Sequence, residues 1–168
     1  MAHPEPLDPA EVRVVTLTVS DTRTEADDVG GRALVEGLRA AGYRCVRHLR
    51  VPDTAAQIRQ AVTSAIDSGE ADAVVSTGGT GIAPRDVTFE AVSGLLEKAL
   101  DGFGEAFRRL SWEQVGPKAV LSRAVAGTYR GGVVIALPGS PKAVTLGVEA
   151  LVVPLLAHAV ALLRGARP

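Results

Sequence analysis

The apolar positions of the chain follow strand-like and helix-like spacings in turn. A continuous apolar run over residues 12–20 predicts a strand buried on both faces, and a shorter run over 73–76 predicts another. Residues 28–41 and 54–69 repeat apolar side chains at helical spacing, so each predicts a helix with one inward face. Residues 43–51 alternate as a strand does, which puts five side chains on one side: Tyr43, Cys45, Arg47, Leu49 and Val51.

The second half of the chain predicts further helices and a pair of strands. Apolar spacing indicates helices over residues 88–100 and 105–115, and the glycines of Gly102-Phe103-Gly104 break the pattern between them. Two strand-like runs follow over 124–129 and 132–137. Because the connection between these two runs is so short, they are expected to pair antiparallel.

Helix ends carry their own signals. Thr54 and Gln57 form a capping-box pattern at the start of the helix over 54–69. The last helix is expected to begin near Pro141, because proline suits the first helical position, and Pro154 should interrupt it. Strands that alternate with helices predict an α/β fold with three layers, α/β/α, around a mostly parallel sheet with an antiparallel edge strand.

Composition narrows the class of protein. The 168 residues suit a single domain, placed at 12–165 after a flexible lead-in over 1–11. A formal net charge of −1 argues against nucleic-acid binding, and one cysteine, Cys45, rules out an internal disulfide and fits a cytoplasmic protein. Cys45 is interpreted as structural rather than nucleophilic. The apolar stretch 144–163 contains Glu149, Pro154 and His158, so it is interpreted as a buried helix or a subunit contact and not as a membrane span.

Four polar segments follow four of the predicted strands. In an open parallel sheet, the loops after the strands lie on the carboxyl edge, where ligands bind. The sequence therefore predicts that these loops meet in one crevice. The segments are Ser20-Asp21-Thr22, Pro52-Asp53-Thr54, Thr77-Gly78-Gly79-Thr80-Gly81 and Pro138-Gly139-Ser140-Pro141.

The loop Thr77-Gly78-Gly79-Thr80-Gly81 is the sharpest of these features. Glycine permits positive φ and lets a ligand approach the backbone, so the loop can surround an oxyanion with N–H groups. The alternative is a tight turn that only links a strand to a helix. The loop matches neither the Walker A pattern nor the dinucleotide-binding fingerprint.

For the charged residues next to these loops, the sequence leaves two alternative roles open. Asp53 and Asp86 are candidates for binding a metal ion, or for accepting hydrogen bonds at the start of the following helices. The segment Pro138–Pro141 presents a second anion site or a rigid helix start. Four cations are either surface charges or a group that offsets a highly anionic ligand: Arg23, Arg85, Arg123 and Lys142.

Taken together, the motifs resemble those of the MoaB/MogA family of molybdenum-cofactor biosynthesis proteins. The resemblance covers about residues 12–163, and Leu121–Gly127 and Ser140 are more similar to the MoaB branch. It is carried by Thr77–Gly81, Arg85-Asp86-Val87-Thr88, Gly102-Phe103-Gly104-Glu105, Leu121-Ser122-Arg123 and Leu137-Pro138-Gly139-Ser140-Pro141.

The resemblance implies a MogA-like fold, a homotrimer or a dimer of trimers, and molybdopterin as ligand. It implies that molybdopterin is adenylylated with Mg-ATP to give adenylyl-molybdopterin and pyrophosphate, with Asp53 and Asp86 as catalytic residues and Mg²⁺ ligands. The product would pass to the molybdate-insertion enzyme. Phosphates would be held by Ser20, Asp21, Thr22, residues 77–81, Pro138, Gly139, Ser140 and Lys142, and the pterin by Glu105, Ser122 and Arg123.

Two other functions stay open from the sequence. The same fold can serve as a molybdopterin carrier that does not adenylylate its ligand. Related domains also occur in nucleotide hydrolases, although usually in longer chains.

Overall fold

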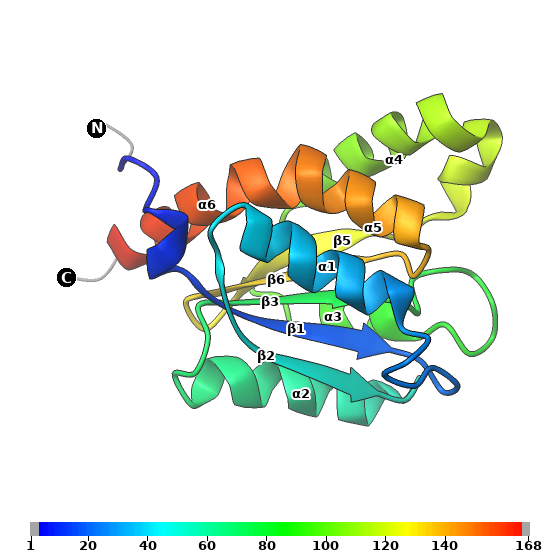
Figure 1. The fold of residues 1–168 in the computed structure, drawn as a ribbon, viewed down its shortest axis with the longest axis horizontal. Coiled ribbons are helices and arrows are strands. Elements are labelled where there is room, and N and C mark those ends of the chain that lie inside the picture. Colours follow the sequence, from blue (N-terminus) through cyan, green and yellow to red (C-terminus); the bar gives the residue numbers. More distant parts are fainter. Residues whose placement is uncertain (1–3, 166–168) are drawn as a thin grey trace.

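The computed structural model describes residues 4–165, which build one six-stranded sheet between two layers of helices (Figure 1). The strands are β1 (Arg13–Val19), β2 (Arg44–Val51), β3 (Ala73–Thr77), β4 (Lys98–Ala99), β5 (Val125–Tyr129) and β6 (Gly132–Leu137). The α-helices are α1 (Val29–Ala40), α2 (Ala55–Asp67), α3 (Thr88–Ser93), α4 (Asp101–Val115), α5 (Pro141–Gly147) and α6 (Val153–Gly165). Short 3-10 helices cover Pro9–Glu11 and Gly116–Leu121, and a π-helical turn covers Val148–Val152.

The sheet has the strand order β2-β1-β3-β6-β5-β4. The first four strands in this order are parallel to one another, whereas β5 is antiparallel to β6 and β4 is antiparallel to β5. The predicted three-layer fold, with a mostly parallel sheet and antiparallel pairing at one edge, is confirmed. The parallel strands β1, β2, β3 and β6 all end at the same edge, which is where the four polar segments begin.

Each face of the sheet has its own apolar core. Helices α1, α4, α5 and α6 cover one face, and α2 and α3 cover the other (Figure 1). The central strands β3 and β6 are buried along their whole length. Such double-sided burial explains their continuous apolar sequence, because neither face of these strands meets water.

The predicted helix over 88–100 is wrong beyond Ser93. The chain turns at Gly94, and residues 97–100 then pair with β5 through hydrogen bonds from Glu97 N to Thr128 O and from Leu100 N to Ala126 O, both 2.8 Å long. The edge of β5 thus provides hydrogen-bond partners for the backbone of residues 97–100. The helical spacing of apolar residues could not predict this pairing. Gly102 and Gly104 do not break a helix either, because both lie inside α4. A Cβ at Gly104 would lie only 2.7 Å from the carbonyl oxygen of Ala124, so the glycine lets α4 approach the sheet.

Strand β2 contains a bulge that changes which side chains share a face. Val14 pairs with Cys45, but Val15 pairs with Arg47, so Val46 has no partner on β1. A bulge residue reverses the alternation of side chains that follow it. Cys45 therefore packs on the α1 side of the sheet, whereas Leu49 and Val51 pack on the α2 side. The prediction that all five alternating residues share one side is wrong for this reason.

The apolar C-terminal segment is a core element. Among the described helices, Pro141–Gly165 is long and apolar enough to cross a membrane by length and composition. Its inward row instead packs on the sheet within the core of the domain: Val144, Val148, Val152, Leu156 and Val160. This agrees with the prediction of a buried helix. The predicted interruption takes the form of the π-helical turn Val148–Val152, which directly precedes Pro154.

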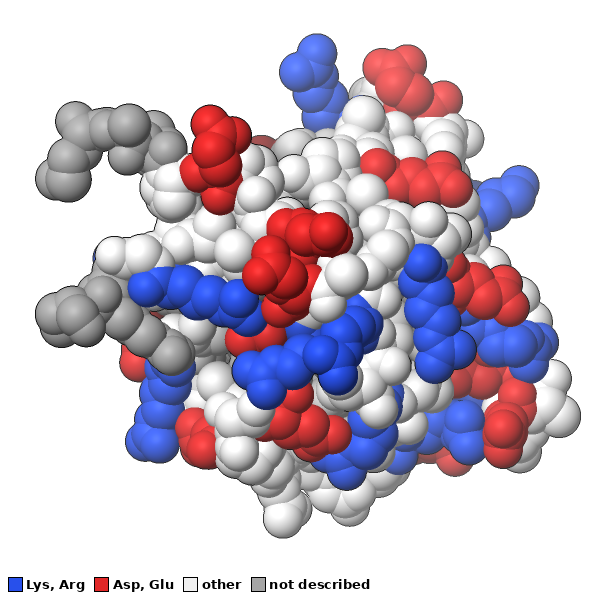
Figure 2. Space-filling view, turned by 60° about the vertical axis from the view of Figure 1, so that its left-hand side comes forward, with Lys and Arg blue, Asp and Glu red and all other residues white. Residues whose placement is uncertain are grey.

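Residues near the N-terminus pack against this last helix. Asp8 caps the turn Pro9–Glu11, and the amide of Leu7 donates to the carbonyl oxygen of Ala157 over 3.5 Å. This part of the predicted lead-in is thus held on α6, whereas residues 1–3 lie outside the described chain. Figure 2, turned toward the end of the sheet that carries the termini, shows basic and acidic side chains intermixed.

Candidate functional site

A cleft of about 610 Å³ opens at the carboxyl edge of the parallel strands. It receives side chains or backbone from all four polar segments that were predicted to converge. The cleft is lined by Thr18, Val19, Ser20, Asp21, Thr22, Arg23, Asp27, Asp28, Gly30, Asp53, Thr77, Gly78, Gly79, Arg85, Asp86, Gly139, Ser140 and Pro141. Both proposed catalytic carboxylates, Asp53 and Asp86, are among them.

The floor of the cleft is built from glycines that pack backbone against backbone. Gly78 and Gly79 have φ angles of +100° and +71°, as the predicted turn requires. A Cβ at Gly78 would collide with the carbonyl oxygen of Val19, and one at Gly139 would lie 3.3 Å from the Cα of Gly78. A Cβ at Gly30 would lie 2.9 Å from the carbonyl oxygen of Gly139. Three separate segments can therefore meet here only because these positions lack side chains.

Not every polar group of the glycine loop faces a ligand. The amide of Gly78 donates to the carbonyl oxygen of Leu137 over 3.0 Å, and the hydroxyl of Thr77 donates to that of Pro138 over 2.9 Å. Thr80 is buried, and neither it nor Gly81 lines the cleft. The part of the loop that is open to a ligand is therefore centred on Gly79.

Asp53 is locked to the loop that follows β1. Its Oδ2 accepts a hydrogen bond from the amide of Asp21 over 3.1 Å, and the amide of Asp53 donates to Oδ1 of Asp21 over 2.9 Å. The cap residue of α2 is Thr54, whose side chain makes no capping hydrogen bond. The predicted capping box is thus wrong, because Thr54 makes no capping hydrogen bond. The alternative role of Asp53 as a helix cap is wrong as well, because its carboxylate bonds to the loop that follows β1 instead.

Asp86 is held over the glycine loop. Its Oδ2 accepts a hydrogen bond from the amide of Ala83 over 3.0 Å, and a Cβ at Gly81 would lie 2.7 Å from that oxygen. Helix α3 is capped by Val87 without a side-chain hydrogen bond, so Asp86 does not cap it. Gly79 plays the same part for Asp53, since a Cβ there would lie 3.1 Å from Oδ1 of Asp53. The glycine loop therefore makes room for both carboxylates.

The cleft is rich in negative charge. Five aspartates line it, against the two cations Arg23 and Arg85. Burial raises the pKa of Asp53 above its ordinary value, and the neighbouring carboxylates of Asp21 and Asp86 raise it further. A phosphate ligand would meet this field unfavourably unless a cation came with it.

The donor set fits Mg²⁺ brought by a phosphate ligand better than a cage made by protein alone. Within residues 4–165, no group of three or more His, Cys, Asp or Glu side chains is arranged to hold a metal ion. Mg²⁺ is commonly held by one or two carboxylates together with substrate phosphates and water. Asp53 and Asp86 both lie against the glycine loop, so they can supply that pair.

The segment Pro138–Pro141 both starts a helix and lines the cleft. The hydroxyl of Ser140 accepts a hydrogen bond from the amide of Ala143 over 3.2 Å, which makes Ser140 the cap of α5. Gly139, Ser140 and Pro141 also line the cleft. Lys142, by contrast, lies in a different hollow on the surface, next to Glu149.

The residues expected on the pterin side lie away from the cleft. Glu105, Ser122 and Arg123 line a second hollow of about 450 Å³ that shares no residue with the first. Arg123 is turned toward the protein. It donates through Nε and Nη2 to the carbonyl oxygen of Gly81, over 3.0 and 2.7 Å, and through Nη2 to that of Asp86 over 3.3 Å. Its guanidinium also pairs with Glu90 and lies 5.0 Å from the ring centre of Phe89. Arg123 thus braces the loop that carries Asp86.

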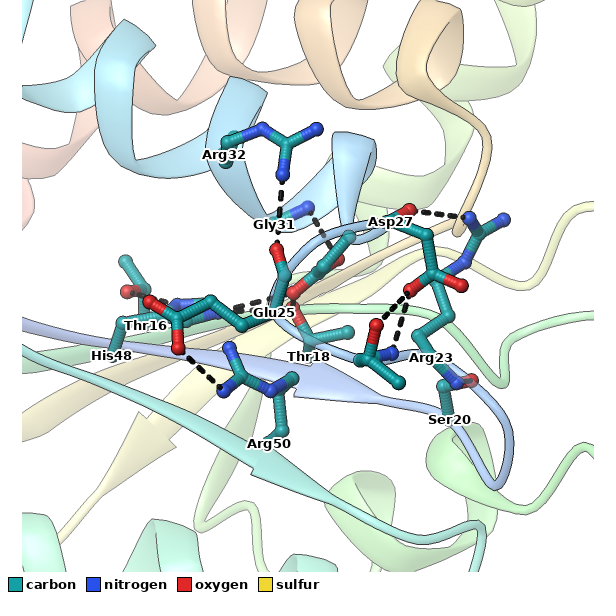
Figure 3. A network of polar contacts seen from close by, with 12 residues as sticks. Thr16, Thr18, Ser20, Arg23, Glu25, Asp27, Gly31, Arg32, His48 and Arg50 are labelled. Carbon is teal, nitrogen blue, oxygen red and sulfur yellow. Dashed lines mark hydrogen bonds and ion pairs between the residues drawn. The ribbon is translucent and has the colours of Figure 1, made fainter.

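One group of residues at the cleft was not predicted from the sequence. Asp28 is buried, caps α1 through the amide of Gly31 over 2.9 Å, and accepts a hydrogen bond of 2.8 Å from the hydroxyl of Thr18 (Figure 3). His48 approaches the same carboxylate to 3.3 Å. An aspartate at the start of a helical pattern is a signal for a cap, but nothing in the sequence pattern placed His48 beside it.

Comparisons with known proteins agree with this architecture. The family described as "Probable molybdopterin binding domain" matches residues 15–158. Molybdenum cofactor biosynthesis protein B of Bacillus cereus is 46% identical over 151 residues, which cover 89% of each chain. A crystal structure of a molybdenum cofactor biosynthesis protein B superposes with a TM-score of 0.89 at 43% identity, covering 98% of this chain and 99% of the other.

A MogA structure is somewhat less similar. It superposes with a TM-score of 0.77 at 33% identity and covers 90% of this chain and 99% of its own. Higher identity to the B proteins agrees with the resemblance of the motifs to the MoaB branch. The chain therefore belongs to the MoaB/MogA family of molybdenum-cofactor biosynthesis proteins.

Proposed function

We propose that this protein binds molybdopterin and adenylylates its terminal phosphate with Mg-ATP, giving adenylyl-molybdopterin and pyrophosphate. The observation that carries the proposal is the convergence of Asp53 and Asp86 on the glycine loop, at one cleft that two other strand-end segments complete. The family membership supports molybdopterin as the ligand, because the matching family is described as a molybdopterin-binding domain.

The chemistry asks for positioning and charge control more than for a strong base. A phosphate oxygen of molybdopterin attacks the α-phosphorus of ATP, and pyrophosphate leaves with the electron pair of the broken P–O bond. The attacking phosphate is already ionised near neutral pH, so the main obstacle is bringing two anions together. Mg²⁺ supplies charge neutralisation and orientation of phosphate oxygens when it is bound.

The residues of this chain divide that work. Asp53 and Asp86 would hold the Mg²⁺, and a bound cation would offset the repulsion among the carboxylates that, after burial, raises the pKa of Asp53. The exposed backbone around Gly79 and the segment Gly139-Ser140 would hold phosphate oxygens from two sides of the cleft. Arg85 and Arg23 offset charge at its rim. Arg123 acts through the loop that it braces and not through the ligand.

The test is pyrophosphate release from ATP and Mg²⁺ in the presence of molybdopterin. We expect release that depends on all three components and stops in Asp86→Asn. A protein that binds molybdopterin in a titration but releases no pyrophosphate would be a carrier, and the adenylylation proposal would then be wrong.

We further propose that the chain assembles as a homotrimer or a dimer of trimers in the cytoplasm. One end of α4 and the following 3-10 helix expose large apolar side chains: Trp112, Val115, Val120 and Leu121. A separate apolar hollow lies between α4 and the C-terminal helices, lined by Leu100, Phe103, Ala106, Ala150, Leu151, Pro154 and Leu155 with Gly102. Exposed apolar patches commonly mark interfaces. Light scattering should give a mass of three or six subunits, and a monomer at micromolar concentration would contradict this.

A further inference from the structure

Asp28, a buried carboxylate in the wall of the cleft, lies beside a histidine that does not line the cleft, and neither was given a role in the mechanism above. Oδ2 of Asp28 faces the hydroxyl of Thr18, and Nε2 of His48 lies within hydrogen-bond distance of both groups, at 3.3 and 3.2 Å. Nδ1 of His48 faces the hydroxyl of Thr16 at 2.8 Å (Figure 3). A threonine hydroxyl can donate or accept, so Thr16 can pair with Nδ1 whether or not that nitrogen carries a hydrogen, which leaves Nε2 able to donate toward Asp28.

This network fixes the start of α1. Oδ1 of Asp28 accepts from the amide of Gly31, and a Cβ at Gly31 would collide with Asp28 and with Thr18. On the other side of the same helical turn, Gly30 lies against the carbonyl oxygen of Gly139. The first turn of α1 is therefore wedged between the Asp28 network and the segment that carries Ser140. Gly30 itself lines the cleft, so a movement of this turn changes the shape of the ligand site.

The loop between β1 and α1 depends on the same anchor. Ser20 to Arg23 line the cleft, and the rest of the loop is bonded back onto the helix start (Figure 3). Arg23 donates to the carbonyl oxygen of Asp27 over 3.0 Å, and Arg32 donates to that of Glu25 over 3.0 Å. These hydrogen bonds join the loop to residues on both sides of Asp28 in the chain, so a shift of Asp28 is expected to move the loop as well.

The hydrogen bonds around Asp28 favour the charged form of its carboxylate. Burial alone would raise the pKa of Asp28, but hydrogen bonds from Thr18, the amide of Gly31 and His48 outweigh burial and lower it. The carboxylate is thus held charged in a buried place. Nearly all buried charges in proteins are paired in this way, because an unpaired one is costly.

We propose that Asp28 and His48 are positioning residues, which hold the first turn of α1 and the preceding loop in the geometry that receives the nucleotide phosphates. Neither residue needs to touch the reacting atoms. His48 reaches Asp28 only because the bulge at Val46 turns it to the α1 side of the sheet, where it pairs in register with Thr16. The inference rests on the proposed function for its ligand measurement, whereas its structural part can be measured without a ligand.

The test compares matched variants in two assays. His48→Leu removes the donor to Asp28, and His48→Gln keeps a nitrogen donor near the position of Nε2. Asp28→Asn is paired with Asp72→Asn as a control. Asp72 is a partly buried carboxylate that also accepts hydrogen bonds from an amide and from cations, but it lies at the opposite end of β1. The first assay is hydrogen exchange at the amides of Gly30 and Gly31, and the second is calorimetric binding of Mg-ATP.

We expect His48→Leu and Asp28→Asn to speed exchange at Gly30 and Gly31 and to weaken Mg-ATP binding about tenfold, a size typical of a small misplacement of binding groups. His48→Gln should stay within about twofold of the wild type, and Asp72→Asn should lower stability without changing either local quantity. Equal weakening by Asp72→Asn, or unchanged exchange and binding in His48→Leu, would overturn the inference. A wild type that binds no Mg-ATP would overturn the proposed function instead, and the exchange data alone would then decide the positioning role.

Discussion

The negative charge of Asp53 is expected to lower the stability of the folded protein and to be required for adenylyl transfer. Replacing Asp53 with asparagine separates these two effects. The folded protein raises the pKa of this carboxyl above the ordinary value of 3.8, through burial and through the charges of Asp21 and Asp86. Asparagine keeps an oxygen that can accept from the amide of Asp21 and removes the charge. We therefore expect Asp53→Asn to be more stable than the wild type at neutral pH and to lose adenylyl transfer.

The size of the stability gain follows from the setting of the cleft. One pKa unit corresponds to about 1.4 kcal/mol. Interactions between charges that face solvent are screened and usually amount to less than about 1 kcal/mol. Asp53 is only half-buried, at an open cleft, so we expect a gain of about 0.5–1 kcal/mol in the free energy of unfolding. For a chain of this size, each kcal/mol of added stability raises Tm by roughly 2–4 °C.

The pH dependence provides the sharper check. A carboxyl whose folded-state pKa is raised binds its proton more tightly in the folded state, so wild-type stability declines as pH rises from 3.8 through the folded-state value. The advantage of Asp53→Asn should therefore be absent near pH 3 and complete at pH 7. Urea unfolding at both pH values measures it, with Glu36→Gln on the exposed side of α1 as the control.

Two results would refute this reasoning. A variant that is less stable than the wild type at pH 7 would show that the charge of Asp53 is favourable in the empty cleft. Pyrophosphate release within about threefold of the wild type would show that the charge is not needed, because a required electrostatic group typically contributes about 10²-fold or more.

Three further predictions address the rest of the site and the sheet. Asp86→Asn should leave the fold intact, because the amide of Ala83 keeps an acceptor, and should reduce pyrophosphate release about 10²-fold; near-normal turnover would exclude Asp86 from the reaction. Gly79→Ala should destabilise the chain by about 1–2 kcal/mol or more, since φ at this position is +71° and the new Cβ would collide with Thr88. The same variant should weaken Mg-ATP binding. Unchanged affinity in calorimetry would argue against phosphate binding by the backbone around Gly79. Asp72→Asn should lower the free energy of unfolding by about 2 kcal/mol at pH 7, because hydrogen bonds from Arg13 and Arg164 outweigh burial and lower the pKa of Asp72. This loss should fade below pH 3.8 as the wild-type carboxyl protonates. A loss that stays constant with pH in urea titrations would contradict this prediction.

The class of fold and the convergence of the four polar segments could be predicted from the sequence alone. Apolar periodicity depends on local chain geometry, so the alternation of strands and helices was visible before any contact was known. Parallel strands must end at a common edge, so Asp53, the glycine loop and Ser140 could be expected in one crevice. Gly78 and Gly79 were recognisable because few other residues adopt positive φ.

The hydrogen-bond partners of the polar groups could not be predicted from the sequence. Asp53 and Asp86 carry the same local signal as helix caps, yet their hydrogen bonds run to Asp21 and to Ala83. Arg123 was assigned to the pterin side from the sequence, and its hydrogen bonds to the carbonyl oxygens of Gly81 and Asp86 could not be predicted. Such choices depend on which partners arrive from distant segments, because a hydrogen bond forms with whichever group folding brings within reach.

The register of β2 shows the same limit most clearly. One unpaired residue, Val46, reverses the facing of every side chain after it, so simple alternation assigned Cys45 and Leu49 to one side when they lie on opposite sides. The reversal carries His48 to Asp28 and creates the network at the wall of the cleft. A bulge is fixed by pairing with β1 and not by the residues of β2 alone, which is why the sequence could predict the strand but not the histidine's partner.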